Sequence, residues 1–252
     1  MQVAHPLIAA GVVDHSAFRA STATSARRLH HTVRAMLTLT FGSASEQERT
    51  LAGIRAIHAR VHGTTREATG RFPAGTTYSA EDPSLVGWVH ITLLESALVA
   101  YDALVAPLSH AERDAYCRET AWVALALGAR DEDVPRTWDA VVANVRRMSA
   151  SGTLAVGADA RAVARALIDT RLSWLLPCSR WANVRLTTGW LPPELRAQYG
   201  LDWNDRRARQ RQWIVSGLRG LRRALPARLF LWRSARGSQA TRGNGPRGTV
   251  AT

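Results

Sequence analysis

The histidines of this chain are the residues whose spacing first suggests chemistry. His90 lies in a long apolar segment, where His90, Leu94, Ala97 and Tyr101 follow one another at spacings of four, three and four residues. This spacing places the four side chains on one face of a helix. A histidine on such a face is usually a hydrogen-bonded core residue, but a buried imidazole is also the usual ligand of heme iron. His90 is therefore a candidate metal ligand, with a structural role as the alternative.

A second group of polar residues precedes this segment. Arg55, His58 and His62 are three and four residues apart, so one helix would place them on one face. His58 and His62 could chelate a metal, although no glutamate separates them as in the HExxH zinc motif, and a solvated helix face is the simpler interpretation. The fixed charge of Arg55 could pair with a propionate or steady bound oxygen. His58 and His90 fall on successive predicted helices, which could hold a planar cofactor between them.

Helix start and stop signals recur along the chain, and no segment alternates as a half-buried strand does. Ser45 to Glu48 and Ser109 to Glu112 have the pattern of a capping box, and Asp82-Pro83 has that of an N-cap followed by proline. The helices expected from these signals cover residues 45–63, 84–105, 109–128, 137–149, 158–175 and 205–225. The histidine candidates fall on the first two.

The composition indicates one large core. The chain has 252 residues, of which 46% are hydrophobic, and a single domain is the default at this length. Its cysteines, Cys117 and Cys178, are too few for a disulfide framework and predict buried thiols in a reducing compartment. The N-terminal sequence lacks the positive region of a signal peptide, and Glu95 and Asp102 interrupt the most apolar stretch, residues 91–106. We therefore expect a cytoplasmic protein.

The positive charge is concentrated at the C-terminal end. The net charge is +13, and twelve arginines but no acidic residue follow Asp205, so the preceding body is nearly neutral. We therefore expect no nucleic-acid partner, while peripheral membrane contact through the basic helix 205–225 stays open. An apolar stripe on this helix predicts that it docks on the core, with arginines on its other faces. The stripe consists of Ile214, Leu218, Leu221 and Leu225.

Six segments, in order along the chain, resemble the MpaB and latex-clearing-protein (rubber oxygenase) catalytic domain family. They are HPLIAAGVVDHSAF (5–18), RRLHHTVRAMLTLTFG (27–42), IRAIHARVHG (54–63), YSAEDPSLVGWVHITLLES (78–96), APLSHAERDAYCRE (106–119) and LTTGWLPPELRAQYGLDW (186–203). The resemblance covers about residues 2–235. It implies an all-α fold, a single globin-reminiscent helical domain with a buried heme pocket. We assign residues 1–235 to this heme-binding oxygenase-like domain and residues 236–252, rich in Arg and Gly, to a disordered tail.

The resemblance also implies roles for individual residues. His90, in Trp88-Val89-His90, matches the family's proximal ligand of a non-covalent heme b, and Arg55 matches the arginine of its distal helix. His58 stands where latex-clearing proteins have a lysine able to occupy the distal iron position, and where many shorter relatives have histidine. The resting iron would then be bis-histidine or five-coordinate, and we favour the first. Trp88, two residues from His90, is expected to pack on the porphyrin edge.

These patterns favour a heme-dependent oxygenase that acts with dioxygen on a small apolar substrate, with or without a double bond. Rubber cleavage as such is not expected, because Ala59 replaces the threonine that follows the distal lysine, and residues 37–42 contain no acid. One alternative is a non-heme metalloenzyme using His58, His62 and His90 with a carboxylate such as Glu95, although Glu95 would point away from His90. Another is a helical binding module whose basic C-terminal helix meets nucleic acid or an anionic membrane.

Overall fold

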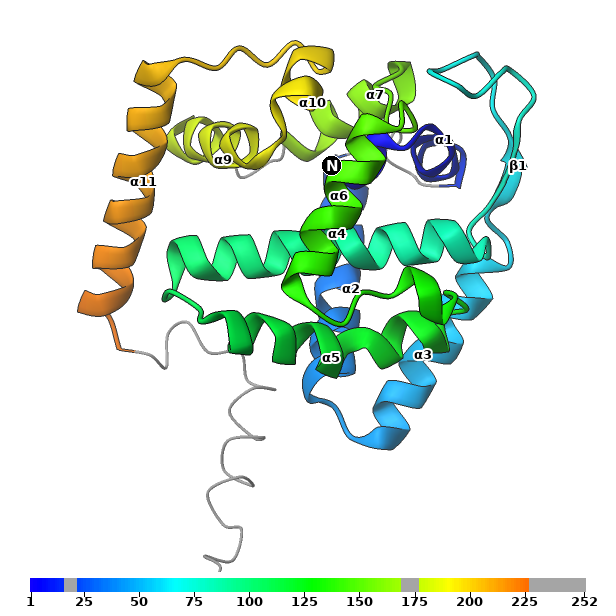
Figure 1. Ribbon diagram of the computed structural model, residues 1–252, viewed down its shortest axis with the longest axis horizontal. Helices are drawn as coiled ribbons and strands as arrows, with labels where there is room; N and C mark the ends of the chain where they lie inside the picture. The colour runs from blue at the N-terminus through cyan, green and yellow to red at the C-terminus, as the bar shows by residue number, and fades with distance from the viewer. Residues whose placement is uncertain (16–21, 169–176, 227–252) are drawn as a thin grey trace, which may run out of the picture.

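The computed structural model of the chain describes residues 1–15, 22–168 and 177–226, and this part is mostly helical (Figure 1). The last of the predicted helix 158–175 and the tail 236–252 lie outside the described residues. The elements, in which η marks a short 3-10 helix, are η1 (Gln2–Ala4), α1 (Pro6–His15), α2 (Thr22–Phe41), α3 (Ala44–His58), β1 (His62–Thr64), β2 (Thr77–Ser79), α4 (Pro83–Leu104), α5 (His110–Ala126), η3 (Asp131–Asp133), α6 (Trp138–Ala150), α7 (Ala158–Ile168), α9 (Pro177–Trp190), α10 (Pro193–Gln198) and α11 (Asp205–Ala224).

Helix α4 is the centre of this arrangement, as its composition predicts. Asp82 caps it by accepting a hydrogen bond from the Ser84 N–H at 2.8 Å, and Pro83 occupies the first turn. Seven of its first ten residues are buried, and α5, α6, α11 and the η1 and η3 turns pack along the helix. By length and composition α4 could span a bilayer, but half of its apolar stretch is buried inside the fold, as in the core helix of a globular protein.

The main core joins α4 to the helices on either side of it. Trp88, the largest fully buried side chain, lies in it together with residues of η1, α5, α6, α7 and α10. The buried members of this cluster are Ala4, Ala9, Trp88, Ile91, Leu94, Leu98, Cys117, Val141, Leu154, Val156, Ala160 and Leu195. The predicted buried thiol is confirmed for Cys117, while the side chain of Cys178 lies outside the described part.

The capping boxes set the starts of two helices, one of them in an unexpected register. At α5 the Ser109–Glu112 box forms as predicted, since the Ser109 N–H donates to the Glu112 carboxylate at 2.8 Å. At α3 the box consists of Ser43 and Glu46, two residues before the predicted pair. Both registers have serine three residues before glutamate, and the end of α2 at Phe41 leaves Ser43 as the residue at the turn between the two helices.

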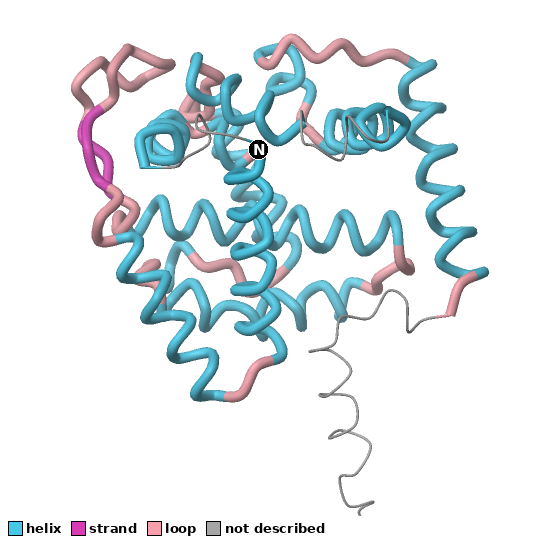
Figure 2. The backbone as a smooth tube through the Cα atoms, turned by 180° about the vertical axis from the view of Figure 1, so that it is seen from behind, coloured by secondary structure: helices cyan, strands magenta, loops and turns pink. Residues whose placement is uncertain are grey.

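A short hairpin follows α3 and corrects two predictions. Helix α3 ends at His58 instead of continuing to residue 63, and His62–Thr64 pairs antiparallel with Thr77–Ser79, His62 lying opposite Ser79. Figure 2 shows this hairpin at one end of the molecule. The expectation that no strand occurs is therefore wrong. The pairing joins segments fifteen residues apart, so its stabilisation does not show in the local sequence pattern.

Helix α11 stands at the side of the molecule and docks in an unexpected way (Figure 1). The Arg219 guanidinium donates to the carbonyls of Asp102 and Ala103, both at 2.6 Å, and Arg222 donates to the Val105 carbonyl at 2.9 Å. These carbonyls belong to the last turn of α4, where helical backbone lacks its own donors and carries partial negative charge. The predicted docking through the apolar stripe is wrong for three of its four residues: Leu218, Leu221 and Leu225 are 40%, 53% and 37% exposed, while Ile214 is half-buried.

Candidate functional site

His90 occupies the buried first half of α4 and has an unused metal-binding atom. The residue is 8% exposed, and its Nε2 atom is buried without a hydrogen-bond partner among the described residues. Burial, and to a smaller extent the positive charge of Arg136, lower the pKa of His90 to about 4. The imidazole is therefore neutral near pH 7, and a neutral imidazole keeps a lone pair on one ring nitrogen. A buried, neutral and unpartnered imidazole is the form in which histidine binds a metal.

The face of α4 that carries His90 is closely approached by the segment after α5. Val86 and Gly87, four and three residues before His90, share this face, and Val86 packs with Ala121 and Val134. A Cβ atom added to Gly87 would lie 2.9 Å from the Asp133 Cβ, so only glycine allows this approach. The approach brings Arg136, which is exposed and paired with Asp131, into electrostatic range of His90. Neither Gly87 nor Arg136 was expected from the sequence.

His58 is the last residue of α3 and lies on the inward side of that helix. The least exposed residues of α3 include Gln47, Leu51, Ile54 and His58, spaced four, three and four residues apart. Burial lowers the pKa of His58, although the negative charge of Glu81 acts in the opposite direction. His58 is therefore half-buried and predominantly neutral near pH 7, as a second metal ligand or a proton acceptor must be.

Arg55 and His58 do not share an environment. Arg55 is exposed, and its guanidinium donates through Nε at 2.8 Å and through Nη2 to the carbonyl of Ala126, the last residue of α5. This interaction ties α3 to the end of α5 and so helps to fix where His58 lies. Within the described residues no hydrogen bond or ring contact joins His58 to His90. A cofactor held between them stays a prediction.

Trp88 lies on the other side of α4 from His90. Two residues along a helix correspond to about 200° of rotation, so the two side chains point in nearly opposite directions. The indole is 2% exposed and packs in the main core. Trp88 thus fixes the rotation of α4, and with it the direction of His90, while its expected contact with a porphyrin edge gains no support from this packing.

The alternative of a non-heme metal site depends on residues that the fold separates. His62 belongs to β1 and is exposed, so it is not one helical turn from His58 as predicted. Glu95 is half-buried on α4, where burial raises its pKa and the Met1 amino group acts in the opposite direction. In residues 1–15, 22–168 and 177–226, no three His, Cys, Asp or Glu side chains gather closely enough to hold a metal ion.

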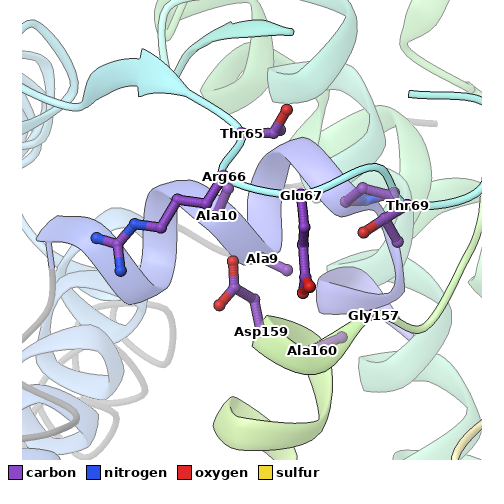
Figure 3. Close-up of a pocket in the computed structure, with 10 residues that line it drawn as sticks. Ala9, Ala10, Thr65, Arg66, Glu67, Thr69, Gly157, Asp159 and Ala160 are labelled. Carbon is purple, nitrogen blue, oxygen red and sulfur yellow. The ribbon is translucent and has the colours of Figure 1, made fainter. Parts of the chain in front are cut away.

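A small surface pocket lies elsewhere, between α1, α7 and the loop after β1 (Figure 3). Glu67 and Asp159 line it from the loop and from α7, beside Thr65 and Arg66. Its lining includes neither His58 nor His90, so it is not the predicted heme pocket.

Comparison with known proteins places this arrangement in a family. The family model for the ER-bound oxygenase mpaB/B'/Rubber oxygenase catalytic domain matches residues 1–227. The chain belongs to this family. The match confirms the resemblance seen in the six sequence segments, and it spans the helices that carry Arg55, His58 and His90.

Two mycobacterial proteins are similar to the chain over almost its whole length. The uncharacterized proteins Mb2261 of Mycobacterium bovis and Rv2237 of Mycobacterium tuberculosis are each 25% identical over 242 residues, which is 92% of this chain and 91% of each relative. No solved structure matches the chain.

Two buried imidazoles, His5 and His90, are neutral and have an unpartnered ring nitrogen among the described residues, and of the two only His90 lies on the central helix α4. His90 supplies a buried, neutral imidazole whose Nε2 has no other partner, and a single axial histidine is sufficient to hold heme iron. A non-heme centre needs three or more ligands together, which the described residues do not gather. The donor set therefore fits heme better than a bare metal ion.

Proposed function

We propose that this protein is a heme-dependent oxygenase that holds a b-type heme through His90 and uses dioxygen to oxidise a small apolar substrate. The observation that carries the proposal is the buried, unpartnered Nε2 of His90 in a chain of an oxygenase family. Heme, when bound, would supply the dioxygen chemistry that amino-acid side chains lack. The chain would supply the ligand, the orientation and the exclusion of water.

The residues around His90 would each have a physical task. Trp88 on the opposite side of α4 is locked in the core, so the rotation of the helix and the direction of His90 are fixed. Burial, and to a smaller extent the charge of Arg136, lowers the pKa of His90 and so keeps its lone pair available. Arg55 would act as a positioning residue, since its bond to the Ala126 carbonyl holds α3 and hence His58. His58, half-buried, would serve as the second axial ligand or accept a proton.

The surface of α4 that follows His90 supports the proposal of an apolar substrate. Leu93, Ala97 and Tyr101 lie three, seven and eleven residues after His90, which places all four side chains on one side of the helix. Leu93 and Tyr101 are 37% and 46% exposed, and Ala97 is exposed as well. An accessible apolar surface thus runs along α4 from the buried histidine toward the end of the helix, and an apolar molecule would lie along it favourably.

Reconstitution with heme tests the proposal. Purified apoprotein titrated with hemin is expected to form a stoichiometric complex with a sharp Soret absorption band, and His90→Ala should lose it. His110→Ala is the matched control, because His110 is an exposed histidine on α5 that pairs with Asp139 at 3.2 Å. Circular dichroism of each variant would separate lost ligation from lost folding. A Soret band of wild-type intensity in folded His90→Ala would overturn the assignment.

Two further variants resolve the coordination and the role of Arg55. If His58 is the second axial ligand, His58→Ala converts the low-spin spectrum of the ferric complex to a high-spin one while heme stays bound. An unchanged spectrum would mean that His58 does not bind the iron, and that it either accepts a proton or has no role in the site. Arg55→Ala should perturb the same spectral feature less than His58→Ala does, because Arg55 acts through the position of α3.

A further inference from the structure

Helix α11 contacts the protein through polar as well as apolar side chains, and it exposes several large apolar side chains to solvent. On its inner side Arg219 and Arg222 bind the end of α4, Gln210 accepts a hydrogen bond from Arg185 Nε of α9 at 2.8 Å, and Arg211 lies over the Trp190 ring. None of its twenty residues is buried. A usual surface helix turns its whole apolar stripe to the core, whereas α11 leaves Trp213 and three leucines exposed.

The exposed residues of α11 form an apolar group and a basic group on either side of Trp213. Trp213 is 74% exposed, the largest exposure among the large hydrophobic side chains described. Helical rotation places Leu221 next to it, with Leu218 and Leu225 beyond. Arg209 and Arg223 lie on the other flank of Trp213, and Arg206 lies above it, all three exposed. Exposed apolar residues beside exposed arginines on one helix are typical of a helix that lies in a membrane interface.

We propose that α11 is a membrane-docking helix that seats this protein on an anionic lipid bilayer. Trp213 would enter the interfacial layer, where an indole places its ring among acyl chains and its N–H among headgroups. Leu218, Leu221 and Leu225 would enter the hydrocarbon boundary beside it. Arg206, Arg209 and Arg223 would pair with lipid phosphates, and no acidic residue follows Asp205 to oppose them. The proposal does not depend on heme or on the identity of the substrate.

A bilayer explains this surface better than a nucleic acid does. Nucleic acid is bound mainly through cationic side chains that contact phosphates, and this explains the arginines but not three exposed leucines in one sector. A bilayer accommodates both the leucines and the arginines, because leucine favours hydrocarbon and arginine favours the headgroup layer. The amphipathic sides of α11 therefore point to lipid.

Vesicle co-sedimentation of the full chain tests the proposal. The protein should sediment with vesicles of phosphatidylcholine containing phosphatidylserine and not with phosphatidylcholine alone, and added salt should weaken the binding. Arg206→Gln with Arg209→Gln should weaken partitioning roughly five-fold for each arginine. Trp213→Ser and Leu221→Ser should weaken it further at high salt, where electrostatic attraction is screened.

Matched controls isolate α11 from the rest of the molecule. Arg146→Gln with Arg147→Gln removes two neighbouring exposed arginines from α6, and Trp122→Ser removes an exposed tryptophan from α5. Arg236→Gln with Arg242→Gln and Arg247→Gln removes charge from the C-terminal segment of the sequence. The proposal requires wild-type binding in the first two controls and more binding in the third than in the α11 variants.

Three results would overturn the proposal. The first is loss of vesicle binding only in the C-terminal variant. The second is tight binding to duplex DNA with no preference for anionic vesicles. The third is a dimer, measured by sedimentation equilibrium, that Trp213→Ser dissociates while vesicle binding is unaffected.

Discussion

Helices α4 and α11 are similar in length and each carries an apolar stripe in its sequence, yet the fold uses them in opposite ways. The first half of α4 is largely buried and holds the Trp88 indole and the His90 imidazole, each with a ring nitrogen that has no hydrogen-bond partner among the described residues. Helix α11 has no buried residue and attaches through arginines to backbone carbonyls of α4. Apolar burial stabilises the first helix, whereas capping of a helix C-terminus attaches the second. An apolar stripe in a sequence therefore identifies one face of a helix, but it does not show whether protein or solvent covers that face.

Replacement of one tryptophan in each helix is the strongest test of this comparison. Trp88→Ala should reduce the free energy of unfolding by about 3–5 kcal/mol, because a fully buried indole leaves a cavity. Trp213→Ala should change it by less than about 0.5 kcal/mol, since the indole is 74% exposed. Urea unfolding followed by circular dichroism measures both. If Trp88→Ala does not fold, Trp88→Phe should still cost more than Trp213→Ala, and equal losses would contradict the contrast.

Local sequence signals predicted much of the fold. The boundaries of α4, α5, α6 and α11 match their predicted ranges within two residues, because capping residues and helical spacing act within one or two turns. The capping box of α3 shows the limit of such signals, since Ser43 and Ser45 each have a glutamate three residues later. Only the end of α2 at Phe41 decides between them. The hairpin of β1 and β2 was missed because its pairing is not local.

The candidate site was predicted in part. The position of His90 on an apolar helix face predicted that its side chain is buried, and the structure confirms a buried imidazole. The neighbours of that imidazole come from distant sequence: Arg136 lies 46 residues further on, and its proximity follows from the close packing of Asp133 on Gly87. Likewise, nothing in the local pattern shows that Arg55 would bind the carbonyl of Ala126. Contacts between elements depend on tertiary packing, which spacing alone does not encode.

The pH dependence of stability should distinguish the central region from α11. His5, 4% exposed beside Phe72 and near the start of α4, has its pKa lowered to about 4 by burial. In the unfolded chain the pKa of His5 is near 6.5. Below that pH the unfolded chain therefore binds a proton that the folded chain does not bind. Stability from this histidine is therefore fully present above about pH 6.5 and lost as the pH falls toward 4. The arginines of α11 keep their charge throughout this range.

The expected loss from His5 alone is about 2 kcal/mol between pH 7.5 and pH 5, from the difference between the two pKa values. Urea midpoints measured at both pH values give the wild-type change. His5→Phe keeps a ring beside Phe72 and removes the titrating group, so its midpoint should fall less over the same interval. An identical fall in the variant would show that His5 titrates normally in the folded protein.

The smallest expected effects come from a pair of glycines, one in each helix. Glycine to alanine within a helix is favourable by about 1 kcal/mol when space is available. No atom of the described residues lies within 4 Å of a Cβ atom built on Gly217 of α11, so Gly217→Ala should stabilise the protein by about that amount. At Gly87 of α4 the same atom would lie 2.9 Å from the Asp133 Cβ, and overpacking of this kind costs about 1–3 kcal/mol. The difference in unfolding free energy between the variants should thus be about 2 kcal/mol.

Because the helix-propensity gain is common to both glycine variants, their difference isolates the approach of Asp133 to α4 beside His90. The same variants also separate stability from site geometry. Gly87→Ala should shift the Soret band of the heme complex or weaken heme binding, since it displaces the segment that carries Arg136. Gly217→Ala should leave both unchanged. Equal unfolding free energies for the two variants would mean that the segment moves away at little cost, and the close packing around His90 would then not be a rigid feature of the fold.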